Sequence, residues 1–600
     1  MPKVAFLSVQ FLARDFKFFR GHGTKSFILS RKSRSGCWEQ RFLGRYLHNK
    51  DIKLNLLRLF RMGKPGRMTA ALYITCLAGL ANAVLIGLIN MAAEEAALGE
   101  RVSVRLFVLY LVAFAIYVLA NQASLRRSND FFQSRLGELR QRLVDKIRHA
   151  ELRTLERLGR GRLYAIVAQE INHLSQNFPL LVGATQSLFL LVFCLFYIAT
   201  LSLISFIVVS AVTALALLYF YVRRKALNDA MVSVHAQEGE MLDSLTHFTE
   251  GFQEIRLNAD KNDALFGSYT RIVDDLQSLI VGIGGKWVVL LLFSNAFLYG
   301  LIGVVIFVLP GFFDGYTDVI YKIAAAGIFC LGPVSSITSA APLFSKANIG
   351  LGHVFSLEDT LDQGRVPRKG GELLGGSRFS GFAQISFEGI SFSYRDEFGA
   401  SLFSIGPWNL NLQRGEVLFL LGGNGSGKST ALKLISALYP LESGCIRVDG
   451  VELVAEEIQE YRELFSCIFP DFHLFERLHG LEHVDAEQVT RLIERMELSE
   501  KVTYADGRFS TQDLSTGQRK RLAMVVALLE DREIYIFDEW AADQDAHFRT
   551  AFYTEILAEL KLAGKTVIVV SHDDRFWHFG DRILTLDLGQ VVSPGAGGQS

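Results

Sequence analysis

The first 350 residues alternate between long apolar segments and polar connections. A helix needs about 20 mostly apolar residues to cross the hydrocarbon core of a bilayer. Six segments meet this condition to differing degrees, at residues 69–93, 104–123, 179–199, 201–222, 287–309 and 319–343. They predict six membrane-spanning helices. The alternative is a set of buried helices in a soluble protein, which six such runs in succession disfavour.

The connections between these segments are alternately short and long. Short links follow the first, third and fifth segments, whereas the long polar stretches 124–178 and 223–286 follow the second and fourth. Both long stretches have helical spacing, so we expect the helices to continue beyond the membrane. The long stretches carry basic clusters, and residues 1–67 contain 16 Lys or Arg against three acidic residues. The positive-inside rule therefore places the long connections and both termini in the cytosol.

After residue 358 the pattern becomes that of a soluble α/β domain. A stretch rich in glycine and charge is followed by strand-like alternation at residues 385–394 and by buried-type apolar runs. We predict an α-helical six-span transmembrane domain followed by an α/β P-loop nucleotide-binding domain. The expected boundaries are a basic N-terminal extension at 1–52, the transmembrane domain at 53–358, a linker at 359–381, the nucleotide-binding domain at 382–593 and a tail at 594–600.

The high share of hydrophobic residues agrees with a membrane protein, and the overall charge gives no support for a nucleic-acid partner. Half of the residues are hydrophobic and the mean hydropathy is +0.25. The formal net charge is zero, so nothing in the overall charge favours nucleic-acid binding. The six cysteines show no metal-ligand spacing and indicate reduced packing residues. Residues 1–52 are either a basic tail or an upstream extension that is not translated.

A glycine-rich loop between a predicted strand and a predicted helix carries the first candidate chemistry. The loop allows backbone amides to turn toward phosphate oxygens, and the helix that follows adds the positive end of its dipole. Lys428 can reach the β- and γ-phosphates, and the Ser429 hydroxyl can ligate Mg²⁺. This P-loop predicts ATP binding through a continuous run of residues: Gly422, Gly423, Asn424, Gly425, Ser426, Gly427, Lys428, Ser429 and Thr430.

Two later apolar runs end in polar side chains. Residues 534–537 lead into Asp538 and Glu539, and residues 567–570 lead into Ser571 and His572. Strands of a parallel sheet end at one edge, so these side chains are expected beside the P-loop. Asp538 is the predicted Mg²⁺ ligand, together with Ser429. Glu539 is the predicted general base that polarises the attacking water.

With the segment 514–518, Leu-Ser-Thr-Gly-Gln, these motifs stand in the order that is typical of the ATP-binding cassette (ABC) family, which the chain resembles. The resemblance implies that His572 contacts the γ-phosphate and acts with Glu539 in catalysis. It also implies that Tyr394 stacks on adenine and that Asp545 belongs to the loop after the Walker B strand. Ser515, Gly517 and Gln518 correspond to the signature that meets ATP bound to the opposite subunit.

Two features of the chain bear on assembly and coupling. Only one P-loop and one set of six spans occur, so the resemblance implies a dimer, most simply with a second identical subunit. Pro470 stands where the family usually has a glutamine that reaches Mg²⁺ and signals to the membrane domain. Proline has no side-chain ligand, so this role is not assigned to it. By position, the helical turns at 159–168 and 251–258 are candidates for the coupling helices of the exporter fold.

Three stretches, residues 251–258, 331–333 and 461–475, resemble bacterial exporters of cyclic peptides, lipopeptides and siderophore precursors, such as pyoverdine, syringomycin and microcin exporters. The resemblance implies a multi-pass half transporter of the bacterial inner membrane. Its expected activity is ATP-driven export of a peptide-derived small molecule by a homodimer in the lipid bilayer. The alternatives are a lipid or multidrug exporter, an importer built on the same fold, and an ATP-binding regulatory module without transport.

Overall fold

The structure is a computed structural model that describes residues 55–61, 65–97, 103–308, 320–365, 378–396 and 398–592. The predicted N-terminal extension, the predicted tail and most of the predicted linker therefore lie outside the described residues. The chain forms two compact units, and each is treated by itself. One comprises residues 1–131 and 177–349, and the other comprises residues 132–176 and 350–600.

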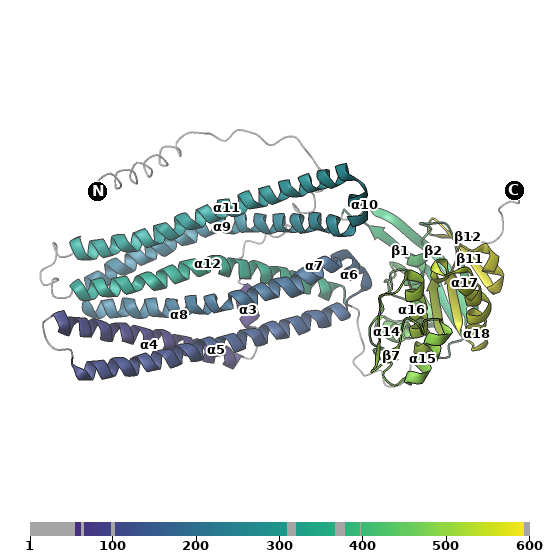
Figure 1. The fold of residues 1–600 in the computed structure, drawn as a ribbon, viewed down its shortest axis with the longest axis horizontal. Helices are drawn as coiled ribbons and strands as arrows, with labels where there is room; N and C mark the ends of the chain where they lie inside the picture. Colours follow the sequence, from purple (N-terminus) through teal and green to yellow (C-terminus); the bar gives the residue numbers. More distant parts are fainter. Residues whose placement is uncertain are drawn as a thin grey trace. The chain divides into compact units, whose positions relative to one another are not determined.

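Long helices dominate the N-terminal half, and each contains all or most of one of the six predicted apolar segments (Figure 1). A short helix, α3 (Asn55–Arg61), precedes them, and the six long helices of the described residues are α4 (Pro65–Ala97), α5 (Val104–Arg148), α8 (Ile171–Leu201), α9 (Leu203–Glu250), α11 (Ala259–Gly303) and α12 (Ile320–Gln363). Among the described residues, five of these helices, α4, α5, α8, α11 and α12, include stretches that are long and apolar enough to cross a membrane. On α9 the described apolar stretch is the shorter Leu203–Ala216.

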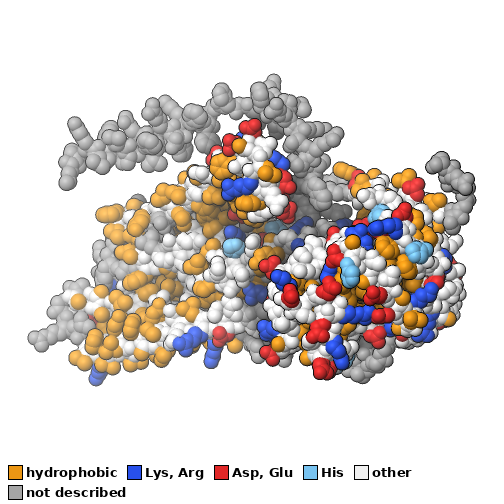
Figure 2. Space-filling model, turned by 45° about the vertical axis from the view of Figure 1, so that its right-hand side comes forward, with side chains coloured by type: hydrophobic (Ala, Val, Ile, Leu, Met, Phe, Trp, Pro, Cys, Tyr) orange, Lys and Arg blue, Asp and Glu red, His pale blue; other side chains and the backbone are white. Residues whose placement is uncertain are grey.

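The surface of these helices suits lipid. Large apolar side chains such as Phe107, Leu119 and Phe196 are exposed, and Figure 2 shows hydrophobic side chains spread over the long helices. Polar groups in this region bind one another: Gln186 Nε2 donates to Asn121 Oδ1 at 3.0 Å and to Ser124 Oγ at 3.1 Å. Gln186 thus joins α8 to α5 by hydrogen bonds, which polar groups between membrane helices need.

The helices α5 and α8 continue beyond their apolar segments, as predicted. They are joined by α6 (Leu152–Leu158), α7 (Arg160–Tyr164) and a π-helical stretch at Ala165–Glu170, while α10 (Phe252–Leu257) joins α9 to α11. The predicted turn at 251–258 coincides with α10. The predicted turn at 159–168 instead continues directly into α8. The separate short helix is α6, just before it, which ends at Gly159 because that residue has a φ of 74°.

The C-terminal half contains two main sheets (Figure 1). The first is antiparallel, in the order β2-β1-β4-β5, with strands β1 (Gln384–Arg395), β2 (Ser401–Gln413), β4 (Ser443–Val448) and β5 (Val451–Glu452). The second has the order β12-β11-β3-β10-β9-β6, with strands β3 (Val417–Leu421), β6 (Phe465–Ile468), β9 (Ile534–Asp538), β10 (Thr566–Val570), β11 (Arg582–Asp587) and β12 (Gln590–Val592).

Short helices surround the second sheet, and a small hairpin pairs β7 (Tyr504–Ala505) with β8 (Arg508–Phe509). The helices are α13 (Lys428–Ile435), α14 (Ile458–Arg462), α15 (Ala486–Arg495), α16 (Thr516–Glu530), α17 (Ala546–Ala551) and α18 (Leu557–Leu562). Strands β3, β9 and β10 are buried along their whole length and pair in parallel. Strands covered on both faces are apolar at every position, which explains why these runs were recognisable in the sequence. Their common carboxyl edge carries the candidate site.

Candidate nucleotide-binding and hydrolysis site

The loop between β3 and α13 has a backbone that only glycine accommodates at two positions. Gly422 has a φ of 149° and Gly427 a φ of 100°. A Cβ on Gly422 would lie 2.3 Å from the Leu586 carbonyl oxygen, and one on Gly427 would lie 3.1 Å from Phe403. The loop therefore keeps the tight path that lets successive amides face an anion, with Asn424 and Gly425 exposed at its tip.

Lys428 begins α13 and is almost completely buried. Its ammonium donates to the carbonyl oxygens of Gly422 at 2.9 Å and Gly423 at 3.0 Å, so the side chain folds over the loop that precedes it. The Ser426 hydroxyl is buried in the same loop without a hydrogen-bond partner in the described structure. A buried cation and an unpartnered hydroxyl in one glycine-rich loop form a suitable cradle for phosphate oxygens.

Asp538 lies at the end of β9 and is 1% exposed. Burial raises the pKa of its carboxyl group, whereas a hydrogen bond from the Ser429 hydroxyl acts in the opposite direction. Its Oδ2 atom is buried and has no hydrogen-bond partner in the described structure. An orphaned carboxylate oxygen beside a serine hydroxyl fits the oxygen ligands that Mg²⁺ prefers.

Glu539 follows Asp538, and its carboxylate lies near the imidazole of His572. The distance between Glu539 Oε1 and His572 Nε2 is 3.2 Å, and both side chains are accessible to solvent. The sheet explains this proximity, because Val570 of β10 pairs with Asp538 of β9 and each predicted side chain follows its strand. Glu539 itself has a left-handed backbone with a φ of 51°, which is unusual for a residue with a Cβ.

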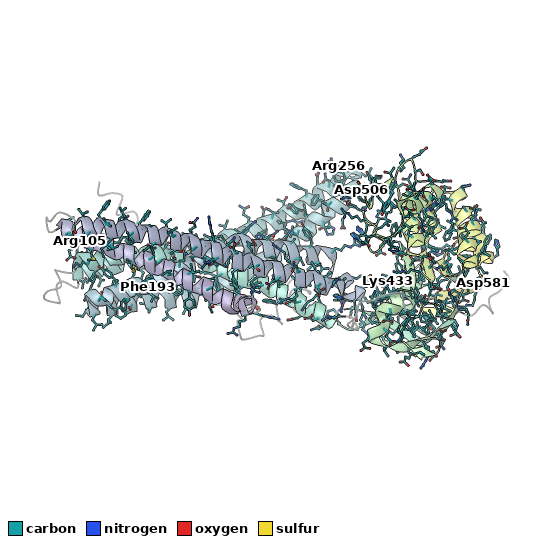
Figure 3. All side chains as sticks on the ribbon, turned by 90° about the horizontal axis from the view of Figure 1, so that it is seen from below. Arg105, Phe193, Arg256, Lys433, Asp506 and Asp581 are labelled. Atoms are coloured by element: carbon teal, nitrogen blue, oxygen red, sulfur yellow. The ribbon has the colours of Figure 1, made fainter. Side chains whose placement is uncertain are left out.

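Tyr394 on β1 stands beside the P-loop helix. Its hydroxyl lies 3.3 Å from the Thr430 hydroxyl and 3.4 Å from that of Tyr439. Tyr439 in turn donates to Glu156 of α6, and Lys433 Nζ lies 2.9 Å from Glu156 Oε1. Lys433, on α13, is labelled in Figure 3. A continuous polar chain thus runs from α6 to the predicted adenine-stacking residue and the P-loop helix.

The predicted signature begins α16. Ser515 caps this helix in a reciprocal capping box with Gln518, so the backbone amides of the first turn are held in a fixed position. Gly517 lies against the segment after β9, because a Cβ there would be 2.7 Å from the Asp543 carbonyl oxygen. Asp545 caps α17 by accepting a hydrogen bond from Phe548 N at 2.9 Å and also pairs with Arg521. The roles of Ser515, Gly517, Gln518 and Asp545 toward a nucleotide stay predictions.

Sequence reasoning did not identify Glu156, Lys433, Tyr439 or Lys520 as parts of this site. Glu156 and Tyr439 are separated by 283 residues, so only the folded chain brings them together. In the sequence, Lys520 is one of three consecutive basic residues, Arg519 to Arg521, and nothing in that run singles it out. The buried-type residues Leu522, Ala523 and Met524 that follow it were the available signal that this face of α16 is covered. Pro470 is exposed two residues after β6, at the same edge as Asp538.

Long lipid-compatible helices joined to a P-loop domain with these carboxylates define a membrane protein that binds a nucleoside triphosphate. Residues 405–542 match the family described as ABC transporter. The ATP-binding protein SyrD of Pseudomonas syringae pv. syringae is 30% identical over 560 residues, which cover 90% of this chain and 96% of SyrD.

Two further proteins resemble the chain over different lengths. An ATP-dependent lipid A-core flippase of Vibrio vulnificus is 27% identical over 297 residues, which cover 47% of this chain and 49% of the flippase. The structure of a bacterial Atm1-family ABC exporter with ATP bound has a TM-score of 0.69 at 15% identity, covering 88% of this chain and 94% of that one. The chain belongs to the ABC transporter family, a family of ATPases coupled to transport. Its fold is that of an ABC exporter half transporter.

Proposed function

We propose that the protein exports a peptide-derived natural product, such as a cyclic peptide, a lipopeptide or a siderophore precursor, across the bacterial inner membrane. The proposal rests on the three stretches that resemble exporters of such molecules, at residues 251–258, 331–333 and 461–475. The similarity to SyrD along nearly its whole length supports a common overall architecture. In this proposal the protein crosses the membrane several times, and both of its termini face the cytosol.

The observation that carries the hydrolytic part is the pairing of Glu539 with His572 beside the P-loop. Glu539 accepts a proton from the attacking water, and His572 orients the carboxylate and the γ-phosphate. Asp538 and Ser429 would hold Mg²⁺, which neutralises phosphate charge when bound. Lys428 leaves its loop carbonyls to bind the β- and γ-phosphate oxygens, since a phosphate is a stronger acceptor than a neutral carbonyl.

The proposed working form is a homodimer, because Ser515, Gly517 and Gln518 at the start of α16 are proposed to complete the site of the second subunit. ATP binding closes the dimer and hydrolysis reopens it. The difference in stability of the closed dimer with ATP and with ADP shifts the membrane helices between inward- and outward-facing states. Tyr394 is proposed to hold adenine, and Asp545, in the loop after the Walker B strand, is proposed to contribute to the nucleotide site.

The test is ATPase activity and transport by the full-length protein in proteoliposomes, with Glu539→Gln beside wild type. We expect peptide-stimulated turnover that the substitution abolishes, and ATP-dependent accumulation of the peptide in inside-out vesicles. Wild-type turnover in Glu539→Gln would overturn the base assignment. Absence of ATPase activity in wild type would favour an ATP-binding regulatory module instead, and uptake in the reverse direction would favour an importer.

Lipid export is the second candidate, and the similarity to the lipid A-core flippase favours it. The two cargo classes are separated by the same preparation. A labelled lipid that crosses the bilayer only with ATP, together with no effect of any peptide on turnover, would identify a lipid exporter. Stimulation by many unrelated hydrophobic compounds would instead identify a multidrug exporter.

A further inference from the structure

Lys520 is a buried cation outside the phosphate cradle. It lies on α16, five positions after Ser515, and is 4% exposed. Burying an ammonium group is unfavourable unless it is paired and hydrogen-bonded. The partners that compensate for its burial therefore show which part of the domain depends on it.

Both partners of the Lys520 ammonium lie in the segment that follows β9. Its Nζ atom donates to the carbonyl oxygen of Glu539 at 2.7 Å and lies 2.7 Å from Asp543 Oδ2. The indole Nε1 of Trp540 donates back to the Lys520 carbonyl oxygen at 2.9 Å. Helix α16 and the peptide that follows the predicted base are thus joined in both directions.

The backbone of Glu539 needs such support. Its left-handed conformation is unfavourable for a residue with a Cβ, and it persists only where the surroundings hold it. Its amide donates to the Val570 carbonyl oxygen at 3.2 Å, and its carboxylate lies against His572. The remaining backbone group, the carbonyl, accepts the shorter of its two hydrogen bonds from the Lys520 ammonium, at 2.7 Å, and the longer one from the Ala542 amide, at 3.4 Å.

We propose that Lys520 is a positioning residue for Glu539, which fixes the peptide after the base and so the direction of its carboxylate. The inference rests on the proposed role of Glu539 as general base. Because α16 begins at the signature, the signature helix and the base then move as one body. In a dimer, the signature of one subunit would contact the ATP bound to its partner. ATP binding at the partner's site would then change the position of Glu539 in the first subunit.

The alternative is a purely structural ion pair with Asp543, and matched substitutions separate the two. Lys520→Met keeps much of the aliphatic volume but has no donor, whereas Lys520→Gln keeps a donor on a similar stem without the charge. Asp543→Asn removes the ion pair and leaves the Lys520 bond to the Glu539 carbonyl in place. ATPase rate, KM for ATP and melting temperature are measured for the full-length protein in proteoliposomes.

We expect Lys520→Met to lower kcat roughly tenfold or more with an unchanged KM, since a misdirected base loses rate rather than affinity. We expect Lys520→Gln and Asp543→Asn to stay within about threefold of wild type. If Lys520→Met alone does not fold, the double variant Lys520→Met with Asp543→Asn, which leaves no unpaired carboxylate, takes its place in the comparison.

A kcat of Lys520→Met equal to that of wild type would overturn the positioning role. So would equal losses of kcat in Lys520→Met and Lys520→Gln that parallel their losses in melting temperature. Glu539→Gln is measured in parallel. An active Glu539→Gln would show that the proposed base is wrong. An inactive Glu539→Gln beside a fully active Lys520→Met would show that only the inference about Lys520 fails.

Discussion

Glu156 of α6 accepts a hydrogen bond from the hydroxyl of Tyr439, a residue of the nucleotide-binding half of the chain. Burial and the Glu156 carboxylate raise the pKa of Tyr439 far above its usual value, so the phenol remains a donor throughout the physiological range. The neighbouring Arg153 donates to the Ser393 carbonyl oxygen at 3.2 Å and lies over the Phe392 ring. Helix α6 is therefore attached directly to the strand that carries Tyr394.

Substitution of Glu156 tests whether the contact between α6 and Tyr439 couples cargo binding to ATP hydrolysis. We expect Glu156→Gln to retain basal ATPase activity and to weaken cargo stimulation by about threefold, because a half-exposed charged pair contributes modestly. The measurement is the ratio of stimulated to basal turnover in proteoliposomes. Arg157→Gln on the same helix is the control, and the same stimulation in Glu156→Gln as in wild type would contradict the prediction.

The ring and the hydroxyl of Tyr394 make separate contributions. We expect Tyr394→Ala to raise the KM for ATP about tenfold, because it removes the stacking surface. Tyr394→Phe keeps the ring and loses the contacts with Thr430 and Tyr439, so its KM should rise by only about threefold. GTP should respond like ATP, since stacking does not distinguish the bases. Equal effects of the two substitutions would exclude stacking.

The stability of the nucleotide-free protein should reveal the cost of burying Asp538. Its folded pKa is raised by burial, so this residue lowers stability as pH rises above the unfolded pKa. We expect Asp538→Asn to melt about 2 °C higher than wild type at pH 7.5 while losing ATPase activity. The difference should shrink when the pH is lowered toward the unfolded pKa of about 4.

Asp545 is the matched control with the opposite sign. The Phe548 amide and the Arg521 guanidinium lower its pKa, so its stabilisation is present above the unfolded pKa and is lost as pH falls through the folded pKa. Asp545→Asn should therefore melt at or below the wild-type temperature at neutral pH. An increase in both variants would show that removal of any carboxylate stabilises the domain.

Pro470 should be dispensable for hydrolysis. It is exposed after β6 and has no side chain that could reach a metal or phosphate. We expect Pro470→Ala to stay within about twofold of the wild-type ATPase rate, with only a small change in stability. A loss of ten times or more would show that the backbone of this segment contributes to the site.

The sequence predicted those features that depend on local pattern. The six apolar runs appear as six long helices, and the runs before the P-loop, Asp538 and His572 form adjacent parallel strands because each is apolar at every position. The placement of α6 was not predicted, since its boundary depends on the single φ of Gly159. The partners of Lys520 and Glu156 were hidden because they are set by tertiary packing between distant segments.

The helical extensions at residues 132–176 belong to the same compact unit as the nucleotide site, whereas the predicted domain boundary lies at residue 382. A recombinant fragment that begins there would lack α6. Tyr439 and Lys433 would lose their carboxylate, and the core that Leu152 covers would be opened to water. A soluble fragment therefore keeps the native packing around Tyr439 and Lys433 only if α6 is supplied, either as a fused segment or as an added peptide.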